Sequence, residues 1–109
     1  MATFHRELTK IFDALSDPTR LAVVERLASG PASVSELSQP FGLRGPSFLK
    51  HLKVLESAGL IRTHKKGRVR TARLEPDALR WVEEWVGRHR RDWERRLDDL
   101  GDFLMQGDN

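Results

Sequence analysis

Basic side chains that can bind a polyanion gather in the middle third of this chain of 109 residues. Residues 42–73 contain nine Lys or Arg against one Asp or Glu, whereas residues 92–109 contain two against six. The formal net charge of the whole chain is only +3, so the charges are separated along the sequence. Such a separation is typical of a protein that holds a polyanion against one face and keeps its acidic end away from it.

The segment 41–59 is the most informative part of this basic region. A glycine-containing turn leads into Pro46, which suits the first position of a helix. Phe48, Leu52 and Leu55 follow at spacings of four and three, which predicts one buried stripe of an α-helix. The opposite face is basic and hydrogen-bonding, and a DNA major groove accepts a helix of this kind.

Ten residues are predicted to contact double-stranded DNA, from this helix, its leading turn and the hairpin that follows. They are Arg44, Gly45, Ser47, Lys50, His51, Lys53, Lys65, Lys66, Arg68 and Arg70. Arg44 can present its guanidinium fork to guanine, whereas Gly45 can donate only through its backbone. The hairpin cations suit flanking phosphates or an adjacent minor groove. Leu49 fits either a thymine methyl or packing against a neighbouring helix, and Arg20 fits either a phosphate or an intramolecular salt bridge.

The rest of the sequence predicts the helices that position this surface. Helical periodicity covers residues 4–15, 18–28 and 78–104. Ser33 and Glu36 form the pattern of a capping box, which opens a short third helix that Pro40 should end. Glycine at position 87 makes a kink in the last helix conceivable.

Two short segments, residues 60–63 and 69–74, are enriched in β-branched side chains. They predict a β-hairpin whose tip is formed by residues 64–68, with basic side chains at the tip and on the outer face. The expected fold class is therefore mainly α with a small two-stranded antiparallel β wing. This order of elements is that of a winged helix-turn-helix in a single domain, residues 1–109.

The chain resembles the ArsR family of bacterial transcriptional repressors from about Ile11 to Leu74. The residues that carry the resemblance are Asp17-Pro18-Thr19-Arg20, Lys50-His51-Leu52-Lys53-Val54-Leu55 and Ala58-Gly59-Leu60. Trp93-Glu94 with Leu97-Asp98 and Leu100 also looks like the tail of a subgroup of that family. The family usually has small polar residues where this chain has Arg44, Gly45 and Leu49, so the bases that are read stay open.

The resemblance implies a homodimer that represses transcription by binding a two-fold operator through helix 46–58 and the 60–74 wing. Residues 1–15 and 77–105 would be dimerisation helices, and residues 16–76 the DNA-binding core. The residues expected at the dimer interface are Phe4, Leu8, Ile11, Leu79, Val82, Val86, Trp93, Leu97 and Leu100. The alternative is a protein-interaction module or a ligand-sensing regulator that uses the winged fold with little DNA specificity of its own.

Catalysis and metal sensing find little support in the sequence. The chain has no cysteine, which excludes a thiolate site. The histidines at positions 5, 51, 64 and 89 fall in four different predicted elements. A site shared across a dimer by His5, His89 and Asp92 is conceivable, but neither a metal site nor a cofactor is predicted. We find no arrangement of residues typical of an enzyme.

Two tryptophans, Trp81 and Trp85, lie one turn apart beside the apolar stripe of the last helix. They fit either the lining of a small-molecule pocket or, more commonly for aromatic side chains, a dimer interface. Any small-molecule effector is unknown. The sequence has no long apolar run and no leader-like start, so we expect a cytoplasmic protein without a membrane segment.

Overall fold

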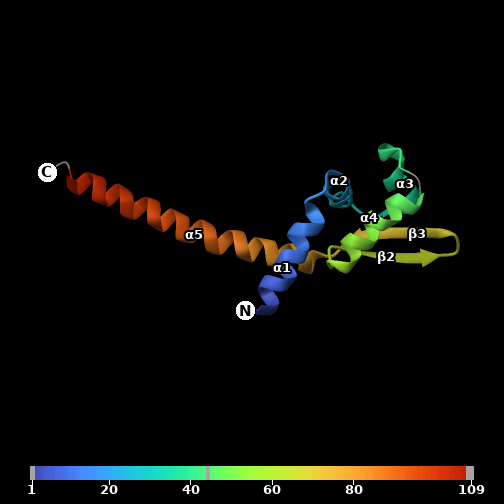
Figure 1. Ribbon diagram of the computed structural model, residues 1–109, viewed down its shortest axis with the longest axis horizontal. Coiled ribbons are helices and arrows are strands. Elements are labelled where there is room, and N and C mark those ends of the chain that lie inside the picture. The colour runs from blue at the N-terminus through green and yellow to red at the C-terminus, as the bar shows by residue number, and fades with distance from the viewer. Residues whose placement is uncertain (1, 44, 108–109) are drawn as a thin grey trace.

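The computed structural model describes residues 2–43 and 45–107. Its elements are α1 (Ala2–Leu15), α2 (Pro18–Leu27), β1 (Ala32–Ser33), α3 (Val34–Ser38), the 3₁₀ turn η1 (Gln39–Phe41), α4 (Gly45–Ser57), β2 (Ile61–Lys66), β3 (Val69–Leu74) and α5 (Pro76–Gly107). Figure 1 shows a compact body from which the outer part of α5 projects as a single rod. The molecule accordingly measures 73 × 29 × 21 Å. This is the predicted winged helix-turn-helix arrangement.

Helix boundaries follow the capping residues seen in the sequence. Asp17 caps α2 by accepting a hydrogen bond from the backbone N–H of Arg20 at 3.0 Å, and Pro18 takes the first helical position. Ser33 caps α3 in the same way, accepting from the N–H of Glu36 at 3.1 Å. Proline at position 40 does not stop the chain from coiling, because the backbone tightens into η1 immediately after α3.

The sheet contains the predicted two-stranded wing, β2 and β3, and one further strand that the sequence did not predict. It has three antiparallel strands in the order β1-β3-β2, and β1 pairs Ala32 with Ala72 and Ser33 with Thr71. A strand of two residues is too short to show any alternation, so the sequence pattern did not reveal it. The hairpin tip is also shorter than expected. Strand β2 runs to Lys66, and the turn uses Gly67 at φ +62°, where a glycine has no steric cost.

The core lies where α1, α2 and α4 meet the inner ends of the strands. Its largest fully buried side chains are Phe48, Ile11, Leu55, Leu60, Ile61 and Val23. Four apolar residues lie at the start of α5. Ala78 is buried in the core, whereas Leu79, Trp81 and Val82 are only partly buried and pack against its rim. The body therefore completes its core with little help from α5.

Helix α5 is longer than predicted and continuous through Gly87 and Gly101. At 1.5 Å per residue its 32 residues span about 48 Å. Within residues 2–43 and 45–107, no helix is apolar over enough length to cross a lipid bilayer.

Candidate nucleic-acid interface

Helix α4 separates its side chains as the periodicity predicted. Phe48, Leu52 and Leu55 are at most 3% exposed and anchor the helix to the body. Ser47, Lys50 and Lys53 are exposed on the other side. Leu49 is 48% exposed, so this leucine keeps much of its surface available to an external contact such as a thymine methyl.

Two of the predicted contacts come from the first residue of α4 and from the residue that precedes it in the sequence. Gly45 is the first residue of α4, and a Cβ added there would meet no atom within 4 Å, so its backbone is open to close approach. Arg44 lies outside the described residues, and its guanine contact stays a prediction.

His51 is directed toward the turn between α1 and α2, not freely outward. Its Nδ1 lies 3.7 Å from Oδ2 of Asp17 and 3.4 Å from a guanidinium nitrogen of Arg20, and the side chain is 24% exposed. Arg20 in turn donates through Nε to the carbonyl of Ala14 at 2.6 Å and through its other terminal nitrogen to the backbone carbonyl of Asp13 at 3.4 Å. Arg20 thus binds backbone carbonyls at the C-terminal end of α1, an internal contact that is a set of hydrogen bonds and not the salt bridge offered as the alternative to a phosphate.

These contacts join the two motifs that carry the family resemblance, Asp17 to Arg20 and Lys50 to Leu55. The backbone N–H of Arg20 lowers the pKa of the Asp17 carboxyl, and the positive charges near it act in the same direction. Asp17 is therefore held ionised beside the imidazole of His51. Sequence reasoning treated the two motifs separately, since nothing in their spacing indicates that they meet.

The strand register assigns each basic residue of the wing to a face. Lys65 lies opposite Arg70, and this pair shares a sheet face with Ile61, whose side chain is buried. Lys65 and Arg70 are therefore on the α4 side of the sheet. The outer-face position predicted for Arg70 was wrong, and Lys65, predicted in the hairpin tip, lies within strand β2. Arg70 donates to Oγ1 of Thr63 at 3.0 Å.

Lys66 and Arg68 are at the end of the hairpin, the farthest part of the wing from the body. The basic residues nearer the body behave differently, because Arg62 and Arg73 both lie within 3.5 Å of the carboxylate of Glu75. Among residues 2–43 and 45–107, no carboxylate oxygen is within 4.0 Å of the positive groups of Lys50, Lys53, Lys65, Lys66, Arg68 or Arg70. These six cations are available to an external anion.

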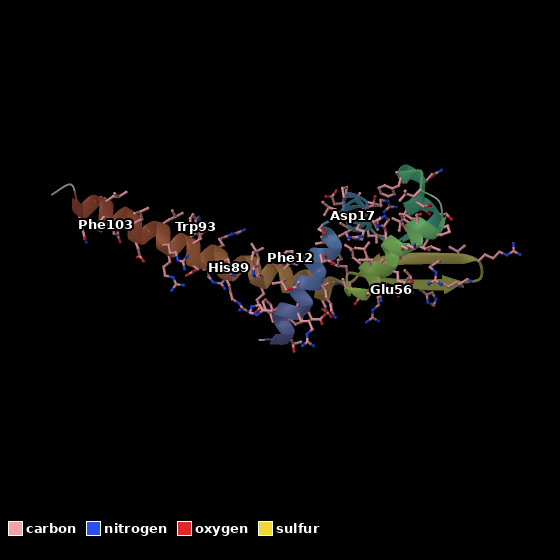
Figure 2. All side chains as sticks on the ribbon, in the orientation of Figure 1. Phe12, Asp17, Glu56, His89, Trp93 and Phe103 are labelled. Carbon is pink, nitrogen blue, oxygen red and sulfur yellow. The ribbon has the colours of Figure 1, made fainter. Side chains whose placement is uncertain are left out.

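The predicted dimer residues fall into two groups. Phe4, Leu8 and Ile11 are 9%, 4% and 1% exposed, so the protomer already buries them. Leu79 and Val82 are partly buried against the same core. The remaining four are exposed on α5: Val86 37%, Trp93 59%, Leu97 48% and Leu100 52%. Figure 2 shows Trp93 and Phe103 on the part of α5 that projects beyond the body.

Trp81 and Trp85 join α5 to α1 within one protomer, which neither interpretation of them anticipated. The Trp81 ring lies 5.2 Å from that of Phe4, and the Trp85 ring lies 5.4 Å from that of Phe12 in an edge-to-face arrangement.

His5, His89 and Asp92 do line one cavity of about 460 Å³ between α1 and α5, together with Arg88, Arg91 and Arg95. Within the described part of the chain, however, no three His, Cys, Asp or Glu side chains are grouped so that they could hold a metal ion. Three arginines also make this cavity unfavourable for a cation.

Comparison with known proteins gives the same architecture. A family model described as a helix-turn-helix domain matches residues 15–64. An HTH-type transcriptional regulator of Mycobacterium tuberculosis is 34% identical over 110 residues, covering 100% of this chain and 99% of the relative. The transcriptional repressor SdpR of Bacillus subtilis is 28% identical over 86 residues, covering 74% of this chain and 94% of that protein.

Among solved structures, the crystal structure of an ArsR family transcriptional regulator is 52% identical and superposes with a TM-score of 0.78 over 82% of this chain and 92% of that one. A second, an ArsR-like regulator from Rhodococcus sp. RHA1, is 30% identical with a TM-score of 0.75 over 92% and 93%. With its winged architecture, its exposed basic helix and these relatives, the chain belongs to the ArsR family of winged helix-turn-helix transcriptional regulators.

Proposed function

We propose that this regulator is a homodimeric repressor that binds a two-fold DNA operator. In this proposal α4 of each protomer enters a major groove, where Ser47, Lys50 and Lys53 contact base edges and phosphates. Lys65, Lys66 and Arg68 of the wing contact the flanking backbone. Arg44 would read a guanine from the turn that precedes α4.

One observation carries the DNA-binding part of this proposal: in the described residues, the cations of α4 and of the outer half of the wing have no carboxylate within 4.0 Å, whereas Arg62 and Arg73, at the inner end of the wing, pair with Glu75. Unpaired cations on a helix that fits a major groove are the expected footprint of a phosphate-contacting surface. Glu56 is the one acidic residue on α4, and it accepts a hydrogen bond from Thr63 of β2 at 3.4 Å.

The exposed stripe of α5 supports the homodimer. Trp93, Leu97, Leu100 and Leu104 recur at spacings of four, three and four, and each is between 48% and 60% exposed. An apolar seam with this repeat is the pattern by which two helices pack side by side. Repression is supported by the Bacillus subtilis relative, which is named a transcriptional repressor.

Selection of bound fragments from a random DNA pool tests the proposal directly. We expect a two-fold motif whose half-site centres are about 34–36 Å apart, one helical turn of DNA. Selected DNA without symmetry, or equal binding to all fragments at physiological salt, would exclude a two-fold operator and favour an interaction module.

Gel-shift titration of the selected site at several salt concentrations tests the assigned surface. Lys65→Ala should reduce the salt slope by about one unit, because one phosphate contact is lost, and should weaken all sequences alike. Arg62→Ala is the matched control, since Arg62 lies on the same strand but already pairs with Glu75. Equal slopes for the two variants would remove Lys65 from the phosphate-contacting set.

A further inference from the structure

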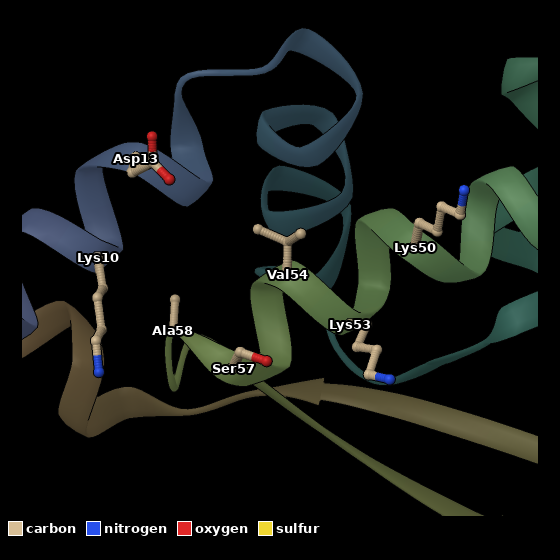
Figure 3. A pocket seen from close by; sticks show the side chains of 7 residues that line it. All are labelled: Lys10, Asp13, Lys50, Lys53, Val54, Ser57 and Ala58. Carbon is tan, nitrogen blue, oxygen red and sulfur yellow. The ribbon is translucent and has the colours of Figure 1, made fainter.

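A groove of about 610 Å³ lies between α1 and the exposed face of α4. Of its lining residues, the proposed DNA contacts include only Lys50 and Lys53. Figure 3 shows its walls, with α1 on one side and the second half of α4 on the other. The lining residues are Lys10 and Asp13 from α1, and Lys50, Lys53, Val54, Ser57 and Ala58 from α4 and its end.

The groove combines two kinds of surface. Most of its exposed lining is apolar, and Val54, which is 38% exposed, and Ala58 lie in its centre. Positive charge surrounds this centre, because Lys10 is on the α1 wall while Lys50 and Lys53 are on the α4 wall. Asp13 is the one acidic residue among the described lining residues, and Lys10 also lies 3.8 Å from the carboxylate of Glu7 on its own helix, so Lys50 and Lys53 supply most of the positive charge that is left without a carboxylate partner.

We propose that this groove binds a small organic anion with an apolar body, such as an aromatic or medium-chain carboxylate, and that binding releases DNA. The apolar body would cover Val54 and Ala58, and the carboxylate would lie within reach of the lysines. A DNA phosphate fits the groove less well, because it is strongly hydrated and has no apolar part that could be buried against Val54 and Ala58.

The position of the groove decides how the anion would act. Lys50 and Lys53 line the groove and also belong to the DNA-contacting surface, so this step rests on the proposed function. An anion that neutralises them also occupies space beside the reading helix, and DNA and the anion then compete for the same side chains. Neither partner needs a conformational change to exclude the other.

Binding is tested on the full-length protein without DNA, using 2-naphthoate as the probe and neutral 2-naphthalenemethanol as its uncharged counterpart. Methyl-labelled NMR titration should shift the Val54 and Ala58 signals with naphthoate and give weaker binding with the alcohol. Absence of shifts at these methyls, or equal affinity for the two compounds, would overturn the anion site.

The role of charge is tested with Lys10→Glu, matched by Arg6→Glu one turn earlier on α1. Both substitutions change the net charge equally, but Arg6 is exposed and does not line the groove. Lys10→Glu should weaken naphthoate by about three- to tenfold more than Arg6→Glu does, as expected when a solvent-screened attraction becomes a repulsion. Equal weakening would mean that only overall charge matters, and the site would be lost.

Release of DNA is measured separately, on the selected operator. Naphthoate should displace the wild-type protein at concentrations near its dissociation constant and should displace Lys10→Glu only at higher concentrations. If naphthoate shifts the methyl signals while DNA stays bound, the competition is disproved. If the protein binds no DNA at all, the proposed function fails, while the NMR titration still decides whether the groove binds an anion.

Discussion

The body of the protomer and the outer arm of α5, residues 87–107, have the same apolar periodicity but bury it very differently. In the body, Phe48, Leu52 and Leu55 of α4 are at most 3% exposed. In the outer arm, Leu97 and Leu100 recur at a similar spacing and are about half exposed. An apolar stripe in a helical sequence therefore indicates a surface that is buried in the folded protein. Whether the protomer itself or a partner buries it depends on the rest of the chain.

This difference has an energetic consequence. In proteins, most of a helix's stability comes from tertiary packing of its apolar face and not from intrinsic helix propensity. The body has its own core, but the outer arm needs a second surface to remain ordered, and a second copy of the same stripe supplies one of equal length. The order of the arm should therefore depend on protein concentration, whereas that of the body should not.

The largest effect is expected in the body. Leu55→Ala removes a side chain that is 0% exposed and should lower the free energy of unfolding by about 2–5 kcal/mol, because it leaves a cavity in the core. Chemical denaturation at fixed protein concentration measures this loss. Leu49→Ala on the same helix is the control, and a comparable loss there would contradict the division of α4 into a buried and an exposed face.

In the outer arm, Leu97→Glu should act on association and leave the body folded. A charge buried without a partner in the seam of each copy should weaken the dimer by about 2–4 kcal/mol. Sedimentation over a range of concentrations measures the dissociation constant, and circular dichroism checks the fold. Gln106→Glu adds the same charge elsewhere on the arm and should leave the dimer intact. A dimer unaffected by Leu97→Glu would mean that another surface joins the protomers.

How much the sequence predicts differs between these regions. Helix α4 and its ends follow from Pro46, the stripe and Gly59, because each of these acts within a few residues. Strand β1 has only two residues, and it forms because Ala32 pairs with Ala72, forty positions later in the sequence. Local pattern carries no information on that pairing. The same limit applies to Phe4, Leu8 and Ile11, which the protomer's own core covers although a partner was expected to.

The candidate site divides in the same way. Exposure of Ser47, Lys50 and Lys53 follows from helical geometry alone and was predicted. His51 was assigned to the same face, yet its ring contacts Asp17 and Arg20 from another part of the chain. Such a contact depends on how α2 packs on α4, which no spacing within either helix reveals.

A smaller effect should come from the glycines of α5. Gly101→Ala should stabilise the helix by about 0.5–1 kcal/mol, because alanine loses less backbone entropy and an added Cβ meets no atom within 4 Å. At Gly87 the added Cβ would lie 3.3 Å from the tip of the Arg91 side chain, which is long and can move. Thermal melts of both variants, with and without Leu97→Glu, measure the gain. A destabilised Gly101→Ala dimer would show that the partner approaches the helix there.

The smallest effect concerns the contact between α2 and α4 in the body, and it depends on pH. Since the pKa of Asp17 is held below its ordinary value of 3.8, the ionised carboxylate stabilises the folded state above that pH. This contribution should disappear as the pH falls below 3.8 and the folded carboxyl takes up its proton. Asp17→Asn keeps a capping side chain but removes the charge, so the variant should melt below the wild type at neutral pH and approach it in acid.

The cause of the shift can be separated by repeating that comparison with His51→Ala in both proteins. The main cause is the hydrogen bond from the backbone N–H of Arg20, which the histidine substitution leaves in place, and His51 contributes less. Most of the pH-dependent difference between Asp and Asn should therefore persist. Its complete loss would mean that the imidazole, which joins α4 to the α1–α2 turn, is what holds Asp17 ionised, and the body would then depend on this junction more than on its helix cap.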